Sequence, residues 1–229
     1  MTTKEKKTTP QKGKMDFQTF ISRIENMILT GVFKPRERLI ESALSQKFGV
    51  SRYTVRDAFK VLETKSLVTV VPFRGVIVTE LSQQEVEEIF VIRAALEKLA
   101  LCLSAQNTTT VDIKVLKKMV KKFEDAYQGD DFATMVVADT NFHDYIFQMS
   151  RNKTLRRMIN DLRNRCFIIR YSAWSSPSVL KKVIEEHHLI VDAIGAFDVV
   201  ALNELSEKHI SHGKEAYLLR LKAENALQA

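Results

Sequence analysis

Two short runs of β-branched residues near residue 70 limit the folds open to this chain more than any other sequence feature. They span residues 67–71 and 76–79 and flank Pro72-Phe73-Arg74-Gly75, which predicts a tight turn. No comparable run occurs later in the chain. The pattern therefore predicts one two-stranded hairpin in a chain whose other elements are helices.

Three helical segments precede this hairpin. Apolar residues three and four apart predict a helix at 16–29 and a short helix at about 40–47, and Ser51 can cap a third. The outer face of the third helix carries cations one turn apart, namely Arg52, Arg56 and Lys60. Three short helices followed by a hairpin is the order of a winged helix-turn-helix, in which the third helix enters the DNA major groove and the hairpin is the wing.

The charge of +7 is concentrated at the N-terminal end of the chain. Residues 1–80 contain 15 Lys and Arg against 8 Asp and Glu, whereas residues 81–229 contain 20 of each. Residues 1–14 are polar and lysine-rich, which predicts a disordered basic tail. Without that tail the remaining excess is small, so charge supports nucleic-acid binding but does not establish it.

Everything after residue 81 has helical periodicity, interrupted by polar breaks. Helices are predicted at 82–106, 110–128, 130–150, 153–174, 177–196 and 198–224. The predicted fold is mainly α, with a winged helix-turn-helix domain at 15–80 and an all-helical antiparallel bundle at 81–229. Two separated cysteines and no long apolar stretch predict a cytoplasmic protein without a disulfide framework or a membrane segment.

One set of polar residues in the bundle has the spacing of a metal site. Asp139 and His143 are four residues apart on one predicted helix. His187 and His209 stand at similar distances on either side of a turn near residue 197, so antiparallel helices bring them to the same height. Three imidazoles and a carboxylate suit a divalent transition metal, with zinc preferred and nickel, cobalt or manganese as alternatives. His188 and His212 point elsewhere by helical rotation, although His212 could replace His209.

The first 80 residues also contain a characteristic set of short motifs: Pro35-Arg36-Glu37-Arg38-Leu39-Ile40-Glu41, Leu44, Phe48-Gly49-Val50-Ser51-Arg52, Val55-Arg56, Leu62-Glu63, Leu67-Val68 and Arg74-Gly75. This set resembles the winged-helix domain of the bacterial GntR family of transcriptional regulators. The resemblance implies DNA contacts through the third helix and the wing, by Arg52, Tyr53, Thr54, Arg56, Lys60, Arg74 and Gly75. The family usually has Gly at positions 36 and 66 and Pro at position 54, which leaves the operator sequence open.

The bundle resembles the FadR-type ligand domain of that family, the FCD domain. The shared pattern is an Asp and a His four residues apart before Asn152, then Glu186-His187, then His209. It implies metal ligation by Asp139, His143, His187 and His209. Arg93, Arg165 and Arg170 are candidate anchors for a carboxylate effector, and Arg93 is the most attractive because the family usually has an arginine at this position. For Arg165 and Arg170, pairing with surface acids is the favoured alternative.

These observations predict a homodimeric regulator that binds double-stranded operator DNA and responds to a small carboxylic acid bound at the metal. Three alternatives remain. The protein could sense the metal itself, or the metal could only stabilise the bundle. The bundle could also be a metal-dependent enzyme, which would need a general base such as Glu186 or Asp144. No such base is evident in the sequence, so we expect a regulator and not an enzyme.

Overall fold

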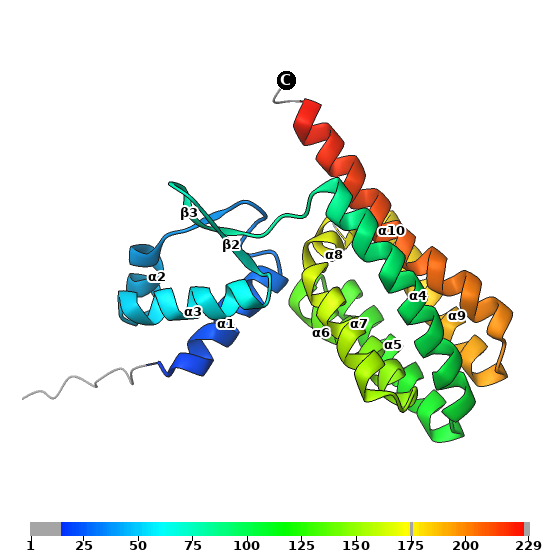
Figure 1. The fold of residues 1–229 in the computed structure, drawn as a ribbon. Helices are drawn as coiled ribbons and strands as arrows, with labels where there is room; N and C mark the ends of the chain where they lie inside the picture. The colour runs from blue at the N-terminus through cyan, green and yellow to red at the C-terminus, as the bar shows by residue number, and fades with distance from the viewer. Residues whose placement is uncertain (1–14, 175, 227–229) are drawn as a thin grey trace, which may run out of the picture.

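The structure, a computed structural model, describes residues 15–174 and 176–226, and the predicted basic tail at 1–14 lies outside this range. We call residues 15–80 the head and residues 81–226 the bundle (Figure 1). The elements of the head are α1 (Phe17–Leu29), β1 (Arg38–Leu39), α2 (Glu41–Phe48), α3 (Arg52–Thr64), β2 (Val68–Val71) and β3 (Gly75–Val78). Those of the bundle are α4 (Gln83–Asn107), α5 (Thr110–Gln128), α6 (Phe132–Met149), α7 (Lys153–Arg165), α8 (Phe167–Trp174), α9 (Pro177–Ala196) and α10 (Val199–Ala226). This order confirms the predicted fold class.

The head contains the predicted three helices and hairpin, together with a strand that sequence analysis missed. Strands β2 and β3 pair antiparallel from Val68–Val78 to Val71–Gly75. The two-residue strand β1 pairs with the other edge of β3, which gives the sheet order β1-β3-β2. Two residues are too few to show an alternating pattern, so no periodicity could have revealed β1.

Two residues of the head adopt a backbone conformation that favours glycine. Arg36 has a φ of 60° and Ser66 a φ of 56°, both in the left-handed region. These are the positions at which the family resemblance predicts Gly. This chain adopts the same left-handed conformation with Arg36 and Ser66 in place of glycine, and each residue reduces the stability of the fold by about 1–2 kcal/mol.

The bundle consists of long helices with well-formed caps. Helices α4 and α5 each begin with a capping box, in which Ser82 pairs with Glu85 and Thr109 with Asp112. The turn between α9 and α10 contains Phe197 in the left-handed conformation. Helix α6 packs against α5 and α4, whereas α10 packs against α4, α8 and α9. These contacts place α6, α9 and α10 around one shared interior.

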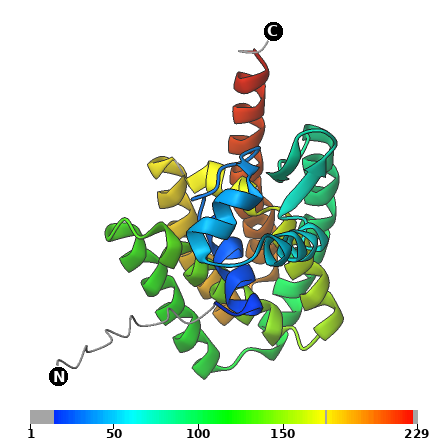
Figure 2. The same ribbon diagram turned by 90° about the vertical axis from the view of Figure 1, so that its left-hand side faces the viewer.

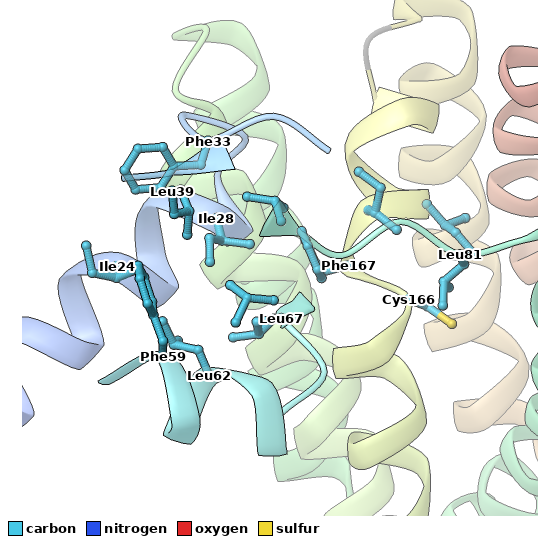
Figure 3. Close-up of a cluster of buried hydrophobic side chains, with 14 of the residues drawn as sticks. Ile24, Ile28, Phe33, Leu39, Phe59, Leu62, Leu67, Leu81, Cys166 and Phe167 are labelled. Carbon is cyan, nitrogen blue, oxygen red and sulfur yellow. The ribbon is translucent and has the colours of Figure 1, made fainter. Parts of the chain in front are cut away.

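One predicted helix, 153–174, is wrong in detail, because it is broken at Cys166 into α7 and α8. Four consecutive residues from Cys166 to Ile169 are buried, with exposed fractions between 0% and 4%. A straight helix on one packing surface buries only every third or fourth residue. Cys166 and the first three residues of α8 can all be buried because this segment lies between the head and the rest of the bundle, as Figure 3 shows for Phe167 and Cys166 beside Leu67 and Leu81.

Head and bundle share one continuous apolar core. It includes Ile24, Ile28 and Leu62 of the head and Phe167 and Tyr217 of the bundle. Seen from the head side, α10 extends past the head (Figure 2). The two parts are therefore packed together rather than joined only by a loose linker.

Polar contacts hold the linker at residues 80–81 to α10. The hydroxyl of Tyr217, which is fully buried, donates to Leu81 O at 2.8 Å and accepts from Leu81 N at 2.9 Å. Glu80 accepts from Arg220 of α10 at 3.2 Å and also pairs with Arg36 of the head. One carboxylate thus joins the head, the linker and α10.

Across the described ranges, none of the helices combines the length and apolar character needed to cross a bilayer.

Candidate metal centre and nucleic-acid interface

Three histidines from three helices converge inside the bundle. His143 lies on α6, His187 on α9 and His209 on α10, and one nitrogen atom of each lies within 4.8 Å of the others. The Nε2 atoms of His143 and His209 are 3.2 Å apart. Ligand atoms bonded at 2.0–2.1 Å to a tetrahedral ion stand about 3.4 Å apart. The spacing of His143 and His209 therefore fits two ligands of one first-row metal ion, with His187 nearby.

The carboxylate of Asp139 completes this set. Its Oδ1 atom lies 3.5 Å from Nε2 of His143 and 3.6 Å from Nε2 of His187. Its other oxygen, Oδ2, accepts from Arg163 at 3.0 Å and lies 3.4 Å from Nη1 of Arg170. Burial alone would raise the pKa of Asp139, but Arg170, His143 and Arg163 hold the pKa well below its usual value. Asp139 is therefore ionised, with one oxygen fixed by arginine and the other facing the histidines.

His187 has the environment expected of a metal ligand. Its side chain is completely buried, and neither ring nitrogen has a hydrogen-bond partner among the described residues. Burial lowers the pKa of His187 well below 6.5 and that of His143 to about 3, so both rings are neutral and can offer a lone pair. A buried imidazole without partners costs roughly 1–3 kcal/mol per polar atom, which a metal bond to one nitrogen would offset.

Glu186 orients His209 from the side away from the other ligands. His209 donates from Nδ1 to Oε2 of Glu186 at 3.0 Å, and His212 donates from Nε2 to Oε1 at 2.8 Å. Because a carboxylate only accepts hydrogen bonds, this contact leaves Nε2 of His209 with its lone pair facing His143. His212 supports Glu186 and does not replace His209, and His188 is on the surface, paired with Glu124 at 2.7 Å.

A cavity of about 70 Å³ adjoins the three-histidine cluster. One water needs roughly 10–15 Å³ by this measure, so the space fits a small ligand or a few waters. Side chains from α4, α6, α7, α8, α9 and α10 line it: Phe90, Arg93, Asp139, His143, Arg163, Ile169, Arg170, Ala173, Trp174, Val183, His209, Ile210 and Gly213.

The structure places the three candidate effector anchors differently. Arg93 lines the cavity, where its Nη2 pairs with Glu97 at 2.8 Å. Arg165 is not among the lining residues. Arg170, the third candidate, does line the cavity, and so does Arg163, which the sequence analysis did not identify. Arg163 follows Leu155 and Ile159 at intervals of four residues, so all three lie on the buried face of α7. An arginine in an otherwise apolar stripe is the sequence signal that could have identified it.

The two candidate general bases are both engaged elsewhere. Asp144 accepts from Arg156 Nε at 2.7 Å and from Asn160 at 2.7 Å, and it does not line the cavity. Glu186 accepts a hydrogen bond from Nδ1 of His209, the ring nitrogen on the side away from the other histidines. Neither carboxylate is placed to activate a water molecule at the three histidines.

The predicted reading helix, α3, presents its cations to solvent. Its buried face holds Val55, Ala58, Phe59 and Leu62. Arg52, Arg56 and Lys60 are exposed, and Tyr53 is 75% exposed. Arg56 forms an ion pair with Glu41 at 2.8 Å, and Lys60 one with Asp57 at 3.0 Å. Exposed pairs of this kind are weak, so DNA phosphates can compete for both cations.

The remaining predicted DNA contacts lie at the start of α3 and on the wing. Thr54 is half-buried, and its backbone N–H donates to Ser51, so it belongs to the helix cap. Arg74 is exposed beside Gly75, whose φ of 82° suits the turn. Gly75 lies against Arg38, since a Cβ there would be 3.7 Å from Nε of that arginine. Sequence analysis did not identify Arg38 as part of this surface.

Comparison with known proteins matches both parts of the chain. Residues 18–78 match the model of the bacterial regulatory proteins, gntR family, and residues 88–212 match the FCD domain. The chain is 28% identical over 200 residues to the HTH-type transcriptional regulator YdhC of Bacillus subtilis (strain 168), covering 86% of this chain and 88% of that protein. It is 29% identical to the HTH-type transcriptional regulator McbR of Escherichia coli (strain K12), covering 82% and 88%. The solved structure of E. coli McbR superimposes with a TM-score of 0.72 at 25% identity, covering 88% of this chain and 98% of that one.

Proposed function

The chain belongs to the gntR family of bacterial regulatory proteins with an FCD domain, and we propose that a small organic acid bound at its metal centre controls its affinity for operator DNA. As a member of this family it is a DNA-binding transcriptional regulator rather than an enzyme, since its relatives are transcriptional regulators. The observation that carries the proposal is His187, a fully buried imidazole whose ring nitrogens have no hydrogen-bond partner among the described residues. Its two neighbours in the cluster, His143 and His209, line a cavity together with three arginines.

The metal would be held by Asp139, His143, His187 and His209. These residues supply three imidazole nitrogens and one ionised carboxylate oxygen, a donor set that suits zinc, nickel, cobalt or manganese. When bound, the metal supplies a Lewis acid that accepts an oxygen of the effector. The chain itself fixes the ligands, through burial of His187 and through Arg163 on Asp139.

The charge around the cavity favours an anionic effector. In the part of the chain that the structure describes, Arg93, Arg163 and Arg170 form ion pairs with two carboxylates, those of Glu97 and Asp139. One positive charge is therefore in excess before a divalent cation is added. Arg170 is the most exposed of the three, at 18% of its side chain, and can turn from Asp139 toward a ligand at the lowest cost. The cavity of about 70 Å³ limits the effector to a small carboxylate.

Helix α10 provides a route from this cavity to the head. His209, Ile210 and Gly213 of α10 line the cavity. Two turns later, Tyr217 and Arg220 hold the linker at Leu81 and Glu80. An effector that prefers one position of α10 would favour one position of the head, and operator affinity would change by the difference in effector binding to the two states. In a homodimer this shift would alter how two α3 helices match a two-fold operator.

The test is a thermal-shift screen of the zinc-loaded protein against small carboxylic acids, repeated after chelation. We expect one class of acid to raise Tm only in the presence of metal. The variant Arg170→Gln should lose this response and keep the stabilisation by zinc alone, while Arg165→Gln, which changes an arginine outside the cavity, should keep both. Stabilisation by zinc with no response to any acid would instead favour a metal sensor or a structural metal.

A further inference from the structure

The tip of the wing carries a large apolar side chain with no packing role. Phe73 lies in the turn between β2 and β3, and its side chain is fully exposed. The hairpin tip points away from the bundle in Figure 1, so no other part of the described chain covers it. Leaving a phenylalanine in water forfeits the stabilisation that its burial would give, so the folded head gains nothing from this side chain.

The backbone at Phe73 is also unfavourable for a residue of this type. Its φ is 63°, in the left-handed region that glycine adopts without strain and a bulky residue does not. The wing thus holds an exposed aromatic ring in a strained conformation, although glycine would satisfy the turn better. Strain of this kind is retained where a function depends on the side chain.

Arginines surround this ring on the open face of the wing. A groove of about 710 Å³ is lined by Arg36, Arg38, Phe73, Arg74 and Ile77, and no acidic residue is among them. Arg36 is paired with Glu80, so Arg38 and Arg74 provide the available charge. The guanidinium of Arg38 lies beside the turn, with Nε 3.7 Å from where a Cβ of residue 75 would stand. An apolar tip between two cations is complementary to the base steps of a DNA groove between two phosphate strands.

We propose that Phe73 is a DNA-contact residue that inserts as an apolar wedge into the minor groove, with Arg38 and Arg74 on the flanking phosphates. Insertion partly unstacks one base step, which is least costly at flexible pyrimidine–purine steps. Phe73 therefore contributes to operator choice by reading the deformability of a step, a different mechanism from the base-edge contacts expected of α3. The proposal rests on DNA binding by the head and is independent of the effector and the metal.

The test uses the full-length protein and a duplex selected by the wild-type protein from a random-sequence pool. Its Kd is measured by fluorescence anisotropy at several salt concentrations for Phe73→Ala, Phe73→Gly and Arg74→Ala. Val200→Ala, at a residue of the bundle that is 70% exposed, is the matched control for loss of an exposed apolar side chain.

Phe73→Ala is expected to weaken DNA binding about 10-fold, which is the loss of apolar contact minus the cost of unstacking that the variant no longer incurs. The slope of log K against log salt should not change, because the variant releases as many counterions as the wild type. Arg74→Ala should make that slope less negative by about 0.9. Phe73→Gly should lose the same affinity as Phe73→Ala and yet raise Tm by about 2–4 °C, because strain is relieved. Val200→Ala should change neither quantity.

A 2-aminopurine base placed at successive steps of the duplex locates the wedge. Fluorescence should rise at one step with the wild-type protein and not with Phe73→Ala, because unstacking removes quenching. Wild-type affinity of Phe73→Ala at every salt concentration would overturn the proposal. So would a change in oligomeric state of that variant, which would place Phe73 in a contact between copies of the chain.

Discussion

Removing the hydroxyl of Tyr217 should loosen the junction between head and bundle without creating a cavity. This hydroxyl makes two hydrogen bonds to the backbone of Leu81, at 2.8 and 2.9 Å. Leu81 is 3% exposed, and burial raises the pKa of Tyr217 to about 12, so the hydroxyl stays protonated. Tyr217→Phe keeps the ring and leaves both backbone groups of Leu81 unpaired in a buried place.

The expected loss is the sum of two effects. Each net hydrogen bond contributes about 1 kcal/mol, and each buried backbone group left unpaired adds a further desolvation cost. Together they lower the free energy of unfolding by roughly 2–4 kcal/mol. The matched control is Tyr145→Phe, which loses one half-buried hydrogen bond to Asp112 inside the bundle and should cost about 1 kcal/mol.

Urea unfolding measures this difference, with far-UV circular dichroism and the fluorescence of Trp174, the single tryptophan of the chain. Trp174 packs against Phe123 and Phe132 inside the bundle, so its emission reports on unfolding of the bundle core. Tyr217→Phe should in addition bind zinc as the wild type does but show a weaker effect of bound acid on operator affinity. If Tyr217→Phe unfolds within about 0.5 kcal/mol of the wild type, or if its loss does not exceed that of Tyr145→Phe, the polar junction contributes little and the reasoning is refuted.

Three further predictions follow from the same contacts. Burial lowers the pKa of His143 to about 3 and that of His187 well below 6.5, so the unfolded chain binds protons below about pH 6.5 that the metal-free folded chain does not. Stability of the metal-free protein is therefore full above that pH and falls on acidification, by up to about 1.4 kcal/mol per pH unit for each histidine; a Tm independent of pH in this window would contradict it. Glu186→Gln should weaken zinc binding about 10- to 100-fold by releasing His209, as measured by competition with a chromogenic chelator, whereas unchanged zinc affinity would remove Glu186 from any orienting role. Ser66→Gly should raise the free energy of unfolding by up to about 1 kcal/mol, since it relieves a φ of 56° at the cost of a more flexible unfolded chain, and a destabilised variant would show that Ser66 is not strained.

The sequence predicted most of the fold because its signals are local. Ser51 caps α3, the β-branched runs form β2 and β3, and α5 has the predicted bounds of 110–128. The break at Cys166 could not be predicted in this way. It depends on burial of α8 from two sides at once, which is a property of how the head sits on the bundle.

The candidate metal residues were accessible from spacing alone, because helical periodicity fixes which residues share a face. The structure brings His143, His187 and His209 together and places Asp139 beside the first two. The arginines were harder to choose, since Arg163, Arg165 and Arg170 differ in direction and not in chemistry. Only packing shows that the first and last of these face the cavity.

The most direct measurement is the Kd of the zinc-loaded protein for a duplex selected from a random-sequence pool, with and without small carboxylic acids and again after chelation. We predict that one class of acid changes this Kd, that chelation and Arg170→Gln abolish the change, and that Arg165→Gln preserves it. A Kd that responds to acids equally with and without metal, or that responds to free zinc and to no acid, would contradict control by an acid bound at the metal centre.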